Sequence, residues 1–141
     1  MKHLIFLSLV LLLVCKSYGQ YTYYSTSNQY YDGNTEEVTE TSIKKQVFSI
    51  SLPDQYLIHT VFKEDGDAVA ESQIYMIISK KEVEDSKGSI LTVKSGVTGN
   101  EYTYIFNFDG DTPVFAQYVD GDFINYVGEL TTFKTYLQDE E

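Results

Sequence analysis

Short runs rich in β-branched and aromatic residues follow one another along the chain from about residue 37, separated by turn signals. The runs are 38–44, 46–52, 56–63, 72–79, 89–94, 101–108, 114–119, 123–127 and 131–137. Pro, Gly, Asp and Asn stand between most of them, at spacings typical of strands joined by short turns. The pattern therefore predicts an all-β domain, built as a single antiparallel meander of about eight strands.

Apolar and polar side chains alternate in the clearest runs. Phe48, Ile50 and Leu52 share one face of their strand, because successive side chains point to opposite faces. No stretch of a dozen residues has a convincing helical period, although 131–137 is also compatible with a short helix. A flat open sheet of this size would expose an apolar face and two edges, so we expect a barrel or a two-layer sandwich.

The first nineteen residues have the organisation of a signal peptide. Lys2 precedes an apolar run from Leu4 to Val14, which is about half the length that a membrane-spanning helix needs. Small residues at Ser17 and Gly19 predict cleavage between Gly19 and Gln20. We therefore expect a secreted or periplasmic protein with no membrane insertion after leader removal, and a mature chain without cysteine, since the single Cys15 leaves with the leader.

Residues 20–36 are rich in tyrosine, serine, threonine and asparagine and contain no aliphatic side chain. Such a composition predicts a flexible N-terminal arm, because it lacks the side chains that usually build a core. An alternative is a segment that docks on a sheet edge or a sugar surface, since tyrosine offers a flat ring and a hydroxyl. The predicted organisation is a leader (1–19), an arm (20–36) and an all-β domain (37–141).

The charge balance narrows the possible partners. The chain has 10 Lys+Arg, all of them lysine, against 21 Asp+Glu. Losing Lys2 and Lys16 with the leader changes the formal net charge from −11 to −13. Nucleic acids and anionic membrane surfaces need a basic footprint, so neither is expected as a partner. We expect a monomer that binds a small molecule or another protein.

Three Asp-Gly-Asp triplets lie between predicted strands. Asp-Gly is a strong hairpin signal, because glycine accepts positive φ and aspartate caps its own turn. Turn formation is therefore the leading interpretation, and no cofactor is expected. The alternative is a structural Ca²⁺ site made by pooled loop carboxylates. Its candidate ligands are Asp65, Asp67, Asp109, Asp111, Asp120 and Asp122. In a meander the last two triplets fall at opposite ends, which separates their carboxylates.

Candidate binding and catalytic residues are few. An aromatic stripe runs along 101–108, and its first members, Tyr102 and Tyr104, are the candidate ligand-binding residues if they face a hydrated cavity. His59 lies in an apolar strand without a nucleophile motif, so a packing role is favoured over catalysis.

These patterns favour a non-enzymatic binding or interaction domain with no catalytic residue and an unidentified ligand. The first alternative is a small hydrolase that uses carboxylates, helped by His59, although no particular acid pair stands out. The second is a structural or adhesive component of the cell surface, for which the tyrosine-rich segment is the motivating feature.

Overall fold

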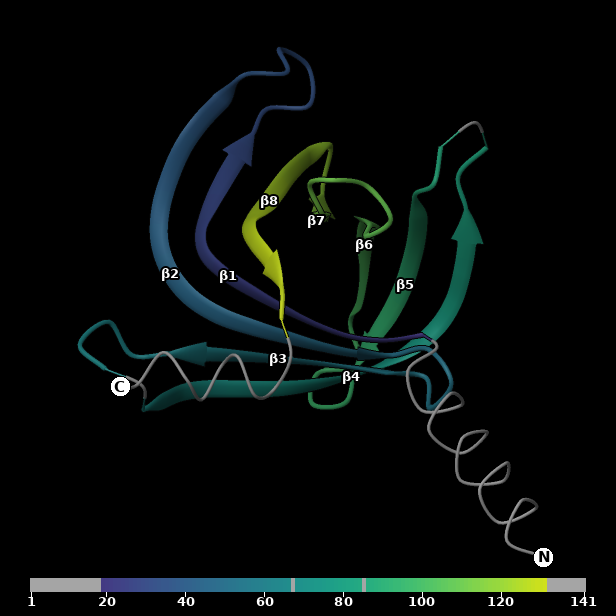
Figure 1. Cartoon of the computed structure of the whole chain (residues 1–141), viewed down its shortest axis with the longest axis horizontal. Helices are drawn as coiled ribbons and strands as arrows, with labels where there is room; N and C mark the ends of the chain where they lie inside the picture. The colour runs from purple at the N-terminus through teal and green to yellow at the C-terminus, as the bar shows by residue number, and fades with distance from the viewer. Residues whose placement is uncertain (1–18, 67, 85, 132–141) are drawn as a thin grey trace, which may run out of the picture.

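The computed structural model describes residues 19–66, 68–84 and 86–131. They form a closed barrel in which each of eight antiparallel strands pairs with its neighbours in sequence order (Figure 1). The strands are β1 (Gln20–Tyr31), β2 (Val38–Ser51), β3 (Tyr56–Phe62), β4 (Val69–Glu82), β5 (Ser89–Ser95), β6 (Glu101–Asn107), β7 (Val114–Val119) and β8 (Asp122–Leu130). The predicted all-β meander is confirmed, and the choice between barrel and sandwich is settled in favour of the barrel.

The expectation of a flexible arm over 20–36 was wrong. Residues 20–31 are strand β1, which pairs with β2 on one side and with β8 on the other, so that it closes the barrel. The physical reason is that tyrosine is a good strand former and its ring can fill a barrel as an aliphatic side chain would. Tyr23 is fully buried, and its hydroxyl donates a hydrogen bond to the Tyr126 carbonyl oxygen at 2.6 Å.

Two of the predicted runs, 38–44 and 46–52, belong to one strand. The long strand β2 passes through the lysine pair at 44 and 45 without a turn and pairs with β1 along most of its length. A bulge between Ser25 and Ser27 interrupts the regular register of β1 against both of its neighbours. Bulges increase local twist and bend, which a small barrel needs in order to close.

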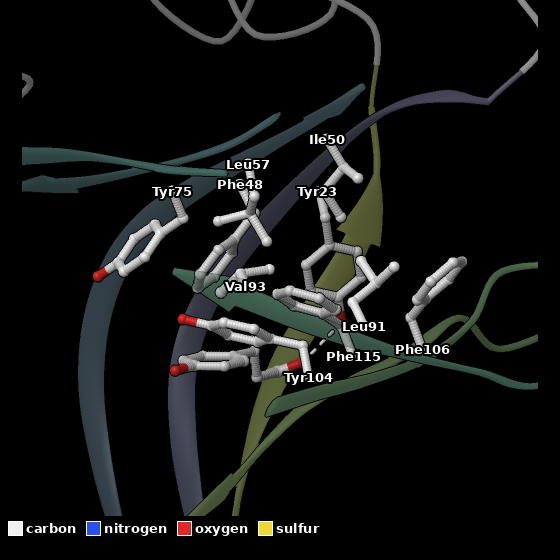
Figure 2. Packing of buried hydrophobic residues seen from close by; sticks show 11 residues of the cluster. Tyr23, Phe48, Ile50, Leu57, Tyr75, Leu91, Val93, Tyr104, Phe106 and Phe115 are labelled. Atoms are coloured by element: carbon white, nitrogen blue, oxygen red, sulfur yellow. Dashed lines mark hydrogen bonds between the residues drawn. The ribbon is translucent and has the colours of Figure 1, made fainter. Parts of the chain in front are cut away.

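A cluster of buried rings fills the middle of the barrel (Figure 2). Phe48 lies at its centre, with ring centroids 4.7 Å from Phe115 and 4.6 Å from Tyr126. Tyr104 stacks on Phe115 at 5.3 Å with an interplanar angle of 3°. Leu57, Leu91 and Val93 complete the packing and are each fully buried. The alternation predicted for Phe48 and Ile50 is confirmed, since both point into this core.

Several sequence predictions lie outside the described residues. They are the leader as far as residue 18, with Cys15, and the last run after residue 131. Among the described residues, no helix has the length and apolar character required to cross a membrane.

Replacing Tyr23 with alanine should lower the free energy of unfolding by about 3–5 kcal/mol, because a fully buried ring and its hydrogen bond are lost. Urea denaturation followed by circular dichroism measures the change. Tyr118→Ala is the control, since that ring is 44% exposed and its removal should cost far less. Equal, small effects of the two substitutions would mean that β1 is not part of the stable barrel.

Gly128 should tolerate no side chain. It lies opposite the β1 bulge, where an added Cβ would come within 1.9 Å of the Tyr24 carbonyl oxygen and 2.7 Å of the Ser25 Cα. Gly128→Ala should therefore lower the free energy of unfolding by about 1–3 kcal/mol or more through overpacking. Gly110→Ala is the matched control, because its nearest neighbour would be the Thr112 carbonyl oxygen at 3.7 Å. Thermal unfolding of the two variants compares them directly.

Candidate functional site

One end of the barrel interior is hollow and polar. The hollow has a volume of about 330 Å³, and its lining comes from β1, β2, β3, β4, β6, β7 and β8. The lining consists of the amides Asn28, Gln46, Gln73 and Gln117, the rings Tyr30, His59, Tyr75, Tyr102, Tyr104 and Tyr126, the charged side chains Lys44 and Glu71, and the aliphatic Val61 and Ile124. We call this space the polar cavity.

A hydrogen-bonded chain of three side chains crosses one wall of the polar cavity. The fully buried Gln46 donates through Nε2 to Asn28 Oδ1, and its Oε1 lies 2.9 Å from His59 Nε2. Because an amide oxygen only accepts hydrogen bonds, His59 is the donor in this pair and carries its hydrogen on Nε2. The His59 ring also stacks on Phe48 at 4.3 Å, which fixes its orientation. These contacts hold the three side chains of this wall in one arrangement.

The other walls combine tyrosine hydroxyls with glutamine amides. The Tyr75 hydroxyl donates to Gln73 Oε1 at 2.6 Å, and Gln73 Nε2 donates in turn to Glu71 Oε1. On the opposite side, the Tyr126 hydroxyl donates to Gln117 Oε1 at 2.9 Å. The amide oxygens of Gln73 and Gln117 are thus each held by a tyrosine hydroxyl, which orients the two planar amide groups. Such pre-oriented polar groups around aromatic faces are typical of ligand pockets.

Most of the polar cavity is uncharged at neutral pH, and burial reinforces this state. Burial raises the pKa of the Tyr104, Tyr126 and Tyr75 hydroxyls, with neighbouring tyrosines contributing in the same direction. Burial also lowers the pKa of His59 to about 4, and the positive charge of Lys44 adds to this effect. The imidazole is therefore neutral near pH 7, and the charged groups of the lining are Lys44 and Glu71.

The two ligand-binding candidates, Tyr102 and Tyr104, both lie on the inward face of β6 and line the polar cavity. Tyr102 is partly buried, and its ring meets Tyr75 edge-on at 5.6 Å with an interplanar angle of 84°. Tyr104 is 2% exposed and stacks within the core. Tyr102 is thus the more accessible of the two, and Tyr104 mainly forms the floor.

The carboxylates of the calcium alternative are divided between the two ends of the barrel. Asp109 and Asp111 follow β6, whereas Asp65 and the pair Asp120 and Asp122 lie at the other end. Figure 1 places the β3–β4 hairpin well away from the β7–β8 turn. The sixth candidate, Asp67, is outside the described residues. Within the described ranges, no group of three His, Cys, Asp or Glu side chains is arranged to hold a metal ion.

The third triplet is a turn in the structure. Asp120 and Gly121 are the two residues between β7 and β8, with φ values of 50° and 99°. Positive φ at both central residues is the geometry of the tight hairpin turn that Asp-Gly favours. Asp122 accepts a hydrogen bond from the Gly33 backbone at 3.1 Å, which ties this turn to the β1–β2 loop.

The opposite end of the barrel has a second hollow of about 520 Å³, with a different character. Tyr21, Phe106 and Phe108 form its aromatic floor, with Tyr21 and Phe108 centroids 5.0 Å apart. Glu82 lies on its wall, where it pairs with Lys80 and accepts a hydrogen bond from the Ser89 hydroxyl at 2.8 Å. Both contacts, that with Lys80 first, lower the pKa of Glu82.

Sequence reasoning missed the amides that organise the polar cavity. Gln46 stands two positions before Phe48 and therefore on the same inward face of β2, and Asn28 is 4% exposed. The available signal was spacing: a residue an even number of positions from a core residue in the same strand points inward, whether it is polar or apolar.

Comparison with protein-family models, curated proteins and solved structures finds no match to this chain.

The His59 environment predicts a pH dependence of stability. Because the pKa is about 4 in the folded protein and near 6.5 unfolded, the unfolded chain binds the proton more tightly. Stability should therefore fall as the pH drops from about 6.5 to 4, by up to about 3 kcal/mol. The difference in unfolding free energy between wild type and His59→Gln, measured across this range, isolates the effect from the carboxylates. An NMR titration of His59 with a midpoint near 6.5 would contradict the prediction.

Proposed function

We propose that this protein is a non-enzymatic binding protein, secreted or periplasmic, that holds a small polar ligand with a ring face in the polar cavity. The observation that carries the proposal is an internal hollow in which tyrosine rings alternate with pre-oriented amides. Aromatic faces stack on the flat side of a ring, and amides and hydroxyls bond its polar edge. The predicted leader supports the location outside the cytoplasm.

The dimensions of the polar cavity favour a compact ligand. Its volume of about 330 Å³ is at the lower end of the range of about 300–1,000 Å³ for small-molecule pockets. The ring cluster around Phe48 and Phe115 closes the barrel beneath it, so a long chain has no path through the interior. A lipid tail would also lie against amides whose hydrogen bonds it could not replace. A small polar molecule fits both conditions.

The chemistry of the lining also favours binding over hydrolysis. Hydrolysis of a glycosidic bond needs two carboxyl groups facing one substrate. Among the described residues, Glu71 is the carboxylate in the polar cavity. The second hollow has Glu82 and Asp109, but the lowered pKa of Glu82 makes it a poor general acid.

The alternative of an adhesive surface component rested on a free tyrosine-rich segment. That segment is β1, where Tyr23 is committed to the core. Binding in the barrel interior has the stronger support, since the interior at this end has a hollow lined by oriented amides and rings instead of a filled apolar core.

Blocking the polar cavity should abolish ligand retention. The mature protein is incubated with a pool of neutral and acidic sugars, nucleosides and phenolic glycosides, desalted, and analysed by native mass spectrometry. We expect wild type to retain at least one compound and Val61→Phe, which enlarges a lining residue, to lose it. Ile58→Phe is the matched control, because Ile58 lies on the same strand but on the outer face, and it should retain the compound. Retention by all three proteins would place binding elsewhere, and retention by none would refute the proposal.

A further inference from the structure

A groove adjoins the polar cavity where β2 and β3 separate. In the part of the chain that the structure describes, the pairing of these strands ends at Gln46 and Val61, while β2 continues beside β1 as far as Val38. Figure 1 shows β1 and β2 curving away from β3 and β4 beyond this point. The groove has a volume of about 940 Å³.

The groove and the polar cavity adjoin. Tyr30, Lys44 and Val61 line both of them. Because Val61 is the last residue of β3 to pair with β2, the two spaces meet where the two strands part. A ligand that contacts both the cavity tyrosines and the groove lysines would therefore cross this boundary.

The groove concentrates positive charge in a strongly acidic protein. Lys44, Lys45 and Lys63 line it, with Glu64 as the acidic residue. Adding Glu71 from the polar cavity leaves three lysines against two glutamates, whereas the whole chain has 10 basic against 21 acidic residues. Because salt screens charges beyond about 8 Å at about 0.15 M ionic strength, a ligand in the groove is affected more by these lining residues than by the acidic balance of the whole chain.

We propose that the ligand is an acidic saccharide, with a sugar ring in the polar cavity and a carboxylate or sulfate group in the groove. This rests on the function proposed above and adds the chemical class. The ring stacks on Tyr102 and its hydroxyls bond the wall amides, such as Gln73. The anionic group binds the lysines, whose ammonium groups are compact charges with several donors. Lys44 lies at the boundary between the polar cavity and the groove, since it lines both spaces.

Calorimetric titration of the mature protein with matched pairs of disaccharides tests this directly. Each pair has the same rings, once neutral and once carrying a uronate carboxylate or a sulfate. We expect the acidic member to bind at least roughly tenfold more tightly in low-salt buffer. This difference in affinity corresponds to one or two charge-assisted hydrogen bonds. This preference should shrink at about 0.5 M salt, where screening is strong.

Two charge-matched variants identify the groove as the origin of the preference. The double variant K45Q/K63Q changes lysines that line the groove but not the polar cavity, so it should lose most of the preference and retain the affinity for the neutral member. The control K81Q/K94Q removes the same charge from residues that line neither space, and it should keep the full preference. Thermal unfolding of both variants verifies that they fold.

The possible outcomes separate this inference from the function on which it rests. Equal affinity of wild type for both members would overturn the acidic ligand and leave cavity binding standing. A preference that survives in the groove variant would exclude the groove as its origin. No binding of any disaccharide, with retention of another compound in the mass-spectrometric assay, would overturn the saccharide class alone. No binding in either assay would refute both.

Discussion

The packing of aromatic rings across the waist of the barrel is the constraint on which the rest of the structure depends. An eight-stranded barrel has an interior just wide enough for side chains to fill it. Here Phe48, Phe115, Tyr104 and Tyr126 contact one another from four different strands, so each ring fixes the position of the others. Because the rings meet at the waist, they close the interior there. The two ends are then left to other side chains.

The chemistry of each end is set by the inward-facing residues that each strand contributes on that side of the ring cluster. On β4 the inward row changes from Glu71, Gln73 and Tyr75 at one end to Lys80 and Glu82 at the other. On β6 it changes from Tyr102 to Phe106. One end therefore receives amides and hydroxyls, and the other receives an aromatic floor with charges at its edge. A single barrel has two chemically distinct hollows as a result.

The meander and its inward faces could be predicted because turns and alternation are local signals. Asp120 and Gly121 were predicted as a turn and form one, and the aromatic stripe that begins at Tyr102 faces inward. Strand β1 could not be predicted in the same way, because its burial depends on pairing with β8, about a hundred residues later. The polar cavity could not be predicted either, because a polar residue such as Gln46 is expected at the surface until its neighbours across the barrel are known.

The pairing of the first strand with the last has a consequence for how the chain folds. The hydrogen bond from Tyr23 to Tyr126 spans 103 residues, and the β1–β8 register cannot form before β8 has been synthesised. Such non-local closure places the protein among slow-folding topologies, with times of about milliseconds to seconds. An incomplete chain keeps the edges of β1 and of its last strand open, because the strand pair that closes the barrel is missing. The barrel can therefore close only when the whole of β8 is available.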